Sequence, residues 1–290
     1  MNTETNPDER QAPFYDLCRL CGGTSNLLCT QNVLSRYDVG YYQCPACDLI
    51  QTQKPFWLPE AYGSALSDLD TGAVERARLS TELTLAAATL LRIPLDAACT
   101  DYGGGHGILV RAMRDHGYDF RWYDTYAQNH FARGFEADPS VRSALLTCFE
   151  VWEHLPDVGA DLAKFFEPGH DALLVGTFLH AGHRPGWWYY CPEVGQHVAF
   201  FSARTMQNVA DRFGYEAIIG RRYTLFHKPG LVSGWRRSLL GQILRRAKPS
   251  RNSRLASISL KLRARNRSRT WDDHVALHER CEAAGRMRAA

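Results

Sequence analysis

The sequence predicts an α/β protein organised around a Rossmann-like, doubly wound sheet. Two observations carry this prediction. Four consecutive apolar runs of strand length alternate with helical patterns, which is typical of a parallel sheet covered by helices. A glycine-rich turn also joins the first of these runs to a helix, as in nucleotide-binding crossover units. A cysteine-rich segment precedes the predicted sheet, and a basic arm follows it.

The glycine-rich turn lies within residues 97–109, which read AACTDYGGGHGIL. An apolar run leads to Asp101, and Gly103, Gly105 and Gly107 then alternate before a helix expected over 108–116. Glycine permits positive φ angles and lets a ligand approach the main chain closely. A helix N-terminus placed after such a turn favours an anionic group. The turn therefore predicts a nucleotide-like ligand at this end of the sheet.

The remaining elements follow from periodicity and punctuation. Alanine and leucine at helical spacing predict a leading helix over 74–93, which ends before Pro94. A carboxylate closing the second strand, Asp124, lies near the spacing expected of a group that binds ribose hydroxyls. The predicted strands are 120–126, a short 131–136, 144–151, 172–179, and an antiparallel pair within 215–226.

Two C-x-x-C pairs near the start of the chain predict a zinc ribbon. Cys18, Cys21, Cys44 and Cys47 have the spacing of a tetrahedral four-thiolate site. Four ligands fill the coordination shell, so we expect a structural Zn²⁺. The N-terminal residues lack the pattern of a signal peptide. We therefore expect a cytoplasmic protein whose nine cysteines are metal ligands or thiols rather than disulfides.

The positive charge is concentrated near the C-terminus. Residues 217–271 hold 15 of the 34 Lys and Arg and none of the 31 Asp and Glu. Within them, 235–248 predicts a basic amphipathic helix, and Thr270 with Asp273 predicts the cap of a last helix ending near Arg286. Such an arm suggests contact with an anionic membrane surface, nucleic acid or an acidic partner. The alternative is an ordinary solvated helix that packs on the domain.

A second group of polar residues follows the strand predicted over 144–151. Glu150, Glu153 and His154 are three and four positions apart, so they share one face if they open a helix. A histidine has a pKa suited to accepting a proton at neutral pH. His197 is the first candidate for a catalytic base and His154 the second, with Glu153 beside them. The aromatic run 187–190 is a candidate lining for an acceptor pocket.

Together, DYGGGHG (101–107), Asp124 and FEVWEHLPD (149–157) resemble class I S-adenosylmethionine (SAM)-dependent methyltransferases. The four cysteines and the block 187–206 resemble bacterial members that carry a zinc-binding N-terminal domain, some acting on sugars or natural products. The resemblance implies SAM as the co-substrate. It assigns cofactor contacts to Asp101, Tyr102, Gly103, Gly105, Gly107, Asp124, Phe149 and Glu150.

The E-x-x-E-H spacing also resembles the metal-binding set of ubiquinone-pathway and small-RNA 2′-O-methyltransferases. In the latter a further histidine completes the site, and His197 lies where it is expected. The resemblance therefore implies Mg²⁺ or Mn²⁺ at Glu150, Glu153, His154 and His197. The simpler alternative is that the motif shapes the SAM pocket and one of its residues acts as the base.

The expected function is methyl transfer from SAM to a small-molecule acceptor, a sugar or hydroxylated natural product, on oxygen rather than carbon. The basic arm makes nucleotide-linked or lipid-linked sugars attractive acceptors and a position at the inner face of the membrane conceivable. The alternatives are an RNA methyltransferase and a non-catalytic protein that keeps the SAM fold. The expected divisions are a disordered leader (1–13), the zinc ribbon (14–60), a linker and leading helix (61–95), the SAM-binding domain (96–228) and the basic arm (229–290).

Overall fold

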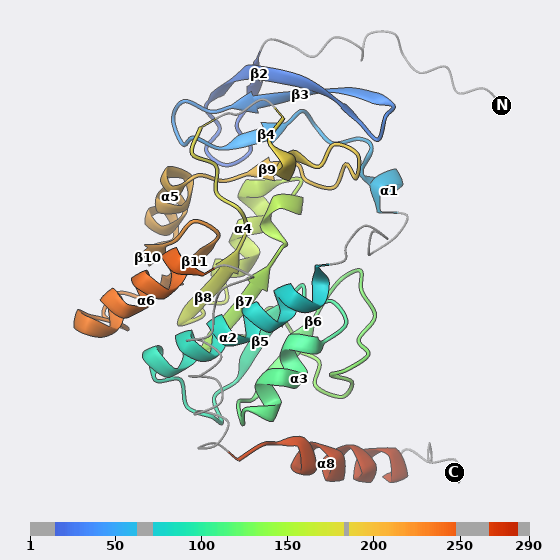
Figure 1. Ribbon diagram of the computed structural model, residues 1–290, viewed down its shortest axis with the longest axis vertical. Coiled ribbons are helices and arrows are strands. Elements are labelled where there is room, and N and C mark those ends of the chain that lie inside the picture. The colour runs from blue at the N-terminus through green and yellow to red at the C-terminus, as the bar shows by residue number, and fades with distance from the viewer. Residues whose placement is uncertain (1–14, 63–71, 183–185, 248–266, 284–290) are drawn as a thin grey trace, which may run out of the picture.

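The structure is a computed structural model that describes residues 15–62, 72–182, 186–247 and 267–283. The predicted leader and most of the serine- and arginine-rich part of the arm lie outside these residues. Two sheets organise the chain, a five-stranded sheet near the N-terminus and a six-stranded sheet in the larger part (Figure 1). No helix among the described residues is long and apolar enough to cross a lipid bilayer.

The six-stranded sheet has the order β10-β11-β8-β7-β5-β6. Strands β5 to β8 run parallel, and β11 runs antiparallel to both β8 and β10. This confirms the predicted mixed α/β sheet and the late antiparallel pair. The strands are β5 (Cys99–Tyr102), β6 (Phe120–Tyr123), β7 (Leu145–Phe149), β8 (Ala172–Gly176), β10 (Glu216–Ile219) and β11 (Tyr223–His227).

The third strand predicted over 131–136 is wrong. That segment makes one parallel bridge, between Trp122 and Glu136, and is otherwise irregular. Its polar groups bond locally, because the Asn129 side chain caps the Ala132 amide and the Glu136 carboxylate accepts from the Gly134 amide. These local bonds compete with the ladder bonds of a strand.

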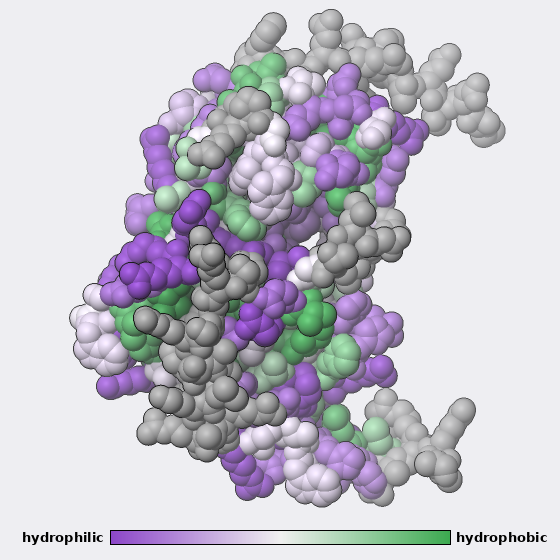
Figure 2. Space-filling view, viewed as in Figure 1, coloured by the Kyte–Doolittle hydropathy of each residue, from purple (hydrophilic) through white to green (hydrophobic). Residues whose placement is uncertain are grey.

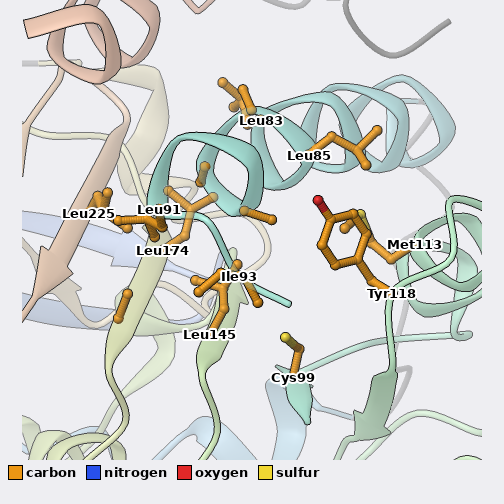
Figure 3. Packing of buried hydrophobic residues seen from close by; sticks show 14 of the residues in the cluster. Leu83, Leu85, Leu91, Ile93, Cys99, Met113, Tyr118, Leu145, Leu174 and Leu225 are labelled. Carbon is orange, nitrogen blue, oxygen red and sulfur yellow. The ribbon is translucent and has the colours of Figure 1, made fainter. Parts of the chain in front are cut away.

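Helices cover both faces of this sheet. Apolar residues of β7 alternate between the two faces, as the pleat requires. Leu145 joins the core beneath α2, α3 and α6, and Leu146 joins the core beneath α4 and α5 (Figure 3 shows part of the first core). The helices are α2 (Ala73–Leu91), α3 (Ile108–Asp115), α4 (Val158–Phe166), α5 (Ala203–Phe213) and α6 (Gly234–Arg246).

The N-terminal sheet has the order β1-β2-β3-β4-β9, with antiparallel neighbours throughout. Its fifth strand comes from the larger part of the chain, because β9 follows β8 in sequence and pairs with β4. A short helix, α1 (Leu58–Ala61), follows β4. The strands are β1 (Tyr15–Leu17), β2 (Thr24–Val33), β3 (Tyr37–Gln43), β4 (Ile50–Thr52) and β9 (Ala199–Phe200).

The basic arm is divided. Helix α6 packs on α2 and β10 through Leu240 and Leu244, which are fully buried, whereas Trp235 and Leu239 remain exposed. The expected apolar stripe is therefore split, with one part packed inside the domain and the other exposed, and the role of the arm stays a prediction. The described chain resumes at residue 267 and forms α8 (Thr270–Ala283) at the far end of the molecule, against α3 (Figure 1).

Asp273 does not form the capping box predicted for α8. It pairs instead with Arg114 of α3 through two hydrogen bonds of 2.8 and 2.7 Å, and both side chains are at most 6% exposed. Burial alone would raise the pKa of Asp273, but the hydrogen bonds and charges of Arg114 and Arg111 outweigh it and leave the pKa lowered. This buried pair fixes the last helix to the domain.

We expect Asp273→Ala to lower the free energy of unfolding by about 3 kcal/mol, because it leaves the Arg114 guanidinium buried beside an empty position. Urea unfolding followed by circular dichroism measures this loss. The matched control is Asp272→Ala, whose partner Arg267 is 81% exposed. That variant should change stability by less than about 1 kcal/mol. Equal losses in the two variants would contradict the assignment.

Candidate functional site

The four predicted zinc ligands lie together. Their Sγ atoms are all within 4.8 Å of one another, and Cys18–Cys47 and Cys21–Cys44 are separated by 3.4 and 3.5 Å. Thiolates bound tetrahedrally to zinc at about 2.3 Å stand roughly 3.8 Å apart. A hydrogen bond from Cys47 lowers the pKa of the Cys18 thiol to about 5, which favours the thiolate that a metal requires. The donor set therefore fits Zn²⁺.

The two C-x-x-C turns have the same backbone form. In each, the residue after the second cysteine has positive φ (Gly22, 75°; Asp48, 66°), and its amide donates to the carbonyl of the first cysteine. Both turns are also bonded to the larger part of the chain. The Thr205 hydroxyl of α5 donates to the Cys47 carbonyl, and the Gly159 amide of α4 donates to the Arg19 carbonyl. The cluster thus lies in the joint between the two sheets.

The glycine turn opens at the carboxyl end of β5. Gly103, Gly105 and Gly107 all have positive φ. A Cβ on Gly103 would lie 2.4 Å from a methyl carbon of Val151, whereas a Cβ on Gly105 would meet nothing within 4 Å. The turn therefore needs glycine at position 103 for packing, and at position 105 it leaves the backbone open to an approaching ligand.

Asp101 lies beneath this turn. The Thr147 hydroxyl donates to one carboxylate oxygen at 2.7 Å, and the other oxygen would lie 3.1 Å from a Cβ on Gly104. The side chain is buried, and this burial raises its pKa to about 7. A cationic ammonium group placed at the turn would favour the ionised form.

Asp124 follows β6 directly, as predicted, but three backbone amides already donate to it. They belong to Gly105 (2.9 Å), Tyr126 (2.7 Å) and Ala127 (2.8 Å). A carboxylate offers about four acceptor positions, so one remains for a ribose hydroxyl. The residue therefore braces the turn and keeps room for a single further bond.

Two other predicted cofactor contacts have side chains packed in the core. The Tyr102 ring lies 4.6 Å from Phe165 of α4, and the Phe149 ring lies 6.1 Å from Tyr223. Both sit where β5 and β7 end, so their backbones border the turn. Their roles as cofactor contacts stay predictions.

The structure brings together Glu153, His154 and His197. One ligand atom from each lies within 4.8 Å of the others. The predicted fourth member, Glu150, is not part of this group, and its predicted convergence on a helix face is wrong. Glu150 adopts φ of 55°, and the helix that follows is a short 3₁₀ turn over Trp152–His154. The reversal at position 150 directs its carboxylate to Arg222, at 3.2 Å.

Backbone carbonyls fix the two histidine rings. His154 Nδ1 lies 3.1 Å from the Gln196 carbonyl oxygen, and His197 Nδ1 lies 2.7 Å from the Tyr189 carbonyl oxygen. A carbonyl oxygen only accepts, so each Nδ1 carries a proton, and in a neutral ring the lone pair is on Nε2. Burial lowers the pKa of His154 to about 3, which keeps that ring neutral. Both rings can therefore offer Nε2 to a cation, whereas the lowered pKa makes His154 a poor proton acceptor.

Glu153 is fully buried at the centre of this group. The Tyr189 hydroxyl donates to its Oε1 atom at 2.5 Å, and its Oε2 atom has no hydrogen-bond partner among the described residues. An unpaired carboxylate oxygen is costly in such a place unless a cation or a donor meets it. Tyr189 was assigned from sequence to an acceptor pocket, and its role as the partner of Glu153 was missed. No sequence signal distinguishes it from its aromatic neighbours.

An aromatic contact that the sequence did not indicate joins the glycine turn to the group of Glu153, His154 and His197. Tyr62, which follows α1, stacks on Tyr126 at 5.1 Å and lies 6.3 Å from His154. Tyr126 is two residues beyond Asp124 and bonded to it. The predicted cofactor turn and the histidine pair are therefore connected through the Tyr62–Tyr126 stack.

A cavity of about 490 Å³ lies on the other side of Tyr189. The aromatic run is divided around it, since Trp187 and Trp188 line the cavity while Tyr189 and Tyr190 are buried in the core. Arg222, the partner of Glu150, also lines it.

Residues 75–218 match a family model described as a methyltransferase domain. Solved structures show distant likeness. Magnesium protoporphyrin IX methyltransferase from Synechocystis PCC 6803 is 11% identical over 59% of this chain and 92% of that chain, with a TM-score of 0.38. The Burkholderia thailandensis 1,6-didemethyltoxoflavin-N1-methyltransferase is 13% identical, covers 65% and 93%, and has a TM-score of 0.44.

The methyltransferase domain of bacterial CtHen1-C is 17% identical over 52% of this chain and 98% of that chain, with a TM-score of 0.37. These likenesses are too distant to indicate a substrate. No curated protein matches. The family match spans the glycine turn, Asp124 and the Glu153 group. The chain therefore carries a methyltransferase domain and is a SAM-dependent methyltransferase.

Proposed function

We propose that the protein transfers a methyl group from SAM to an oxygen of a hydroxylated small molecule, a sugar or natural product. The observation that carries this proposal is the group of Glu153, His154 and His197, which brings two imidazole rings together with the unpaired oxygen of a buried carboxylate. Acceptors that must lose a proton during transfer need such groups.

SAM supplies an electrophilic methyl group on a positively charged sulfur. The protein has to hold the acceptor oxygen in line with that methyl group and remove the proton from it. We assign cofactor binding to the turn 103–107, with Asp101 facing the methionine end and Asp124 giving its remaining acceptor position to the ribose. These residues fit the cofactor because the turn is open at Gly105 and acidic groups lie beneath and beside it.

The donor set of Glu153, His154 and His197 also fits a divalent cation. Carbonyl bonds at Nδ1 are the usual support of metal-binding histidines, since they fix the tautomer and the ring orientation. Two imidazoles favour a transition metal such as Mn²⁺ over Mg²⁺, which prefers oxygen. When bound, such an ion would lower the pKa of an acceptor hydroxyl. Without an ion, His197 would be the base, because the lowered pKa of His154, the second candidate from sequence, makes that ring a poor proton acceptor.

We expect labelled SAM to mark small hydroxylated acceptors, and not RNA, in a screen over nucleotide sugars, glycolipids and RNA.

Glu153→Gln should lower kcat at least about 100-fold, because the neutral amide neither binds a cation nor supports a charged imidazole. With zinc already loaded, calorimetry should show about one equivalent of Mn²⁺ bound by the parent protein and none by Glu153→Gln.

The matched control is Glu150→Gln, because the Glu150 carboxylate pairs with Arg222 and lies outside the group of Glu153, His154 and His197. It should retain Mn²⁺ binding. If Glu153→Gln loses activity but the parent protein binds no Mn²⁺, the mechanism with a histidine base stands and the metal site is excluded. Unchanged activity in Glu153→Gln would contradict the assignment of the site.

The raised pKa of Asp101 predicts pH-dependent cofactor binding. A carboxyl group with a pKa of about 7 is increasingly protonated below that pH and then loses its attraction for the methionine ammonium group. The Kd for S-adenosylhomocysteine, measured by calorimetry from pH 5.5 to 8.5, should rise below pH 7, approaching about tenfold per pH unit.

Asp101→Asn should bind more weakly and show no such rise. Thr147→Val offers a second control, since its hydroxyl lowers the pKa of Asp101 and its loss should move the change to higher pH. An unaltered pH profile in Asp101→Asn would assign the dependence to another group.

We also propose that the four cysteines hold one structural Zn²⁺ per chain. Metal analysis should find one equivalent, and Cys47→Ser should lose it and lower Tm by on the order of 10 °C, because the cluster fixes both sheets. Cys29→Ser is the matched control, since Cys29 lies on β2 outside the cluster. Full stability of a zinc-free Cys47→Ser protein would refute the structural role.

A further inference from the structure

The cavity beside Tyr189 is separate from the cofactor turn. It opens past the carboxyl end of β8, between the turn joining β10 to β11 and the last residues of α6. Its volume of about 490 Å³ is within the range that binds small molecules. Its polar and aromatic lining comes from Phe178, His180, Trp187, Trp188, Arg221, Arg222 and Arg245.

The lining carries positive charge and no acidic residue. Arg222 is buried and pairs with Glu150. Arg221 and Arg245 are exposed, and neither forms an ion pair among the described residues. Hydrophilic side chains gather on this face around β10, β11 and α6 (Figure 2). Two guanidinium groups are therefore available to an anion, and Arg binds phosphate oxygens in pairs through its planar fork.

Aromatic rings form the wall opposite these charges. Trp188 is 62% exposed although it is a large apolar residue, and its ring lies 5.0 Å from that of Phe178. The guanidinium of Arg222 lies 4.3 Å from the other ring, that of Phe178. An exposed tryptophan face next to arginines suits a planar base or a sugar ring that carries phosphate.

One residue separates this cavity from the Glu153 group. The Phe178 ring lies 5.0 Å from Tyr189, whose hydroxyl donates to Glu153 and whose ring lies 4.6 Å from His197. Tyr189 is buried, so the rings of Phe178 and Tyr189 form the partition between the cavity and the histidines. This arrangement separates a binding subsite from the reacting atoms.

We propose that this cavity binds the diphosphate of the acceptor, with Arg221 and Arg245 meeting its two charges and Trp188 contacting the adjoining group. The proposal rests on the function proposed above, since it states that the acceptor of that reaction carries a diphosphate group by which the protein binds it. A diphosphate diester carries two negative charges, which matches the two unpaired guanidinium groups. The diphosphate is attached either to a nucleoside or to a lipid, and the arginines of the cavity would bind the diphosphate in both cases.

The test is calorimetry on the full chain saturated with S-adenosylhomocysteine, which keeps the probes out of the cofactor site. The probes are UDP, farnesyl diphosphate and inorganic pyrophosphate. We expect UDP or farnesyl diphosphate to bind, and the double variant Arg221→Gln/Arg245→Gln to raise the Kd at least about tenfold. Tighter binding of UDP, weakened several-fold by Trp188→Ala, identifies a nucleoside diphosphate, and tighter binding of farnesyl diphosphate identifies a lipid diphosphate.

Two controls separate this proposal from the previous one. Arg204→Gln removes an exposed arginine of α5 outside the cavity and should leave the Kd unchanged. Glu153→Gln should also leave the Kd unchanged even where it abolishes methyl transfer. No binding by any of the three probes, or equal binding by the double variant and the parent protein, would overturn the proposal. Neither result depends on whether Glu153 serves in catalysis.

Discussion

The pairing of β4 with β9 is the constraint on which the site depends. It aligns Ile50 with Phe200 and Gln51 with Ala199, and so joins the cysteine-bearing sheet to the methyltransferase domain. Val198 directly precedes β9, and its amide donates to the Glu153 carbonyl while its own carbonyl accepts from the Thr52 amide. Displacing β9 would therefore displace Glu153 and His197 together. The N-terminal sheet therefore helps to hold the backbone of Glu153 and His197 in position.

Other contacts from the N-terminal part support the same arrangement. The partly buried Arg19 side chain donates to the carbonyls of Thr52, Pro156 and Val198, and Trp57 donates to the Gly195 carbonyl. These bonds hold both segments that carry the histidines. Groups that bind a cation or move a proton need this rigidity, because a shift of about 1 Å is enough to reduce catalysis strongly. This explains how a cysteine cluster without a catalytic ligand position can still matter for methyl transfer.

The two glutamates of the E-x-x-E-H motif have different surroundings. Glu153 is buried beside His154, His197 and Tyr189, whereas Glu150 is 29% exposed on its side chain and pairs with Arg222. Burial and the neighbouring Glu153 raise the pKa of Glu150 to about 7. Glu150 therefore links the Glu153 group to the arginine-lined cavity. Arg222 both pairs with Glu150 and lines the cavity, so the charge of Glu150 acts on one of the arginines there.

The sequence by itself determined the elements and most of the candidate site. Glycine spacing, apolar periodicity and C-x-x-C spacing are local signals. They predicted the turn at 103–107, the four grouped cysteines, and helices over 74–93 and 108–116, which the structure has over 73–91 and 108–115. Only the tertiary structure decided that Glu150 lies outside the group of Glu153, His154 and His197, that Tyr189 donates to Glu153, and that α6 contributes Arg245 to a cavity. These features depend on a positive φ at one residue and on contacts between segments distant in sequence, and neither has a signature in local pattern.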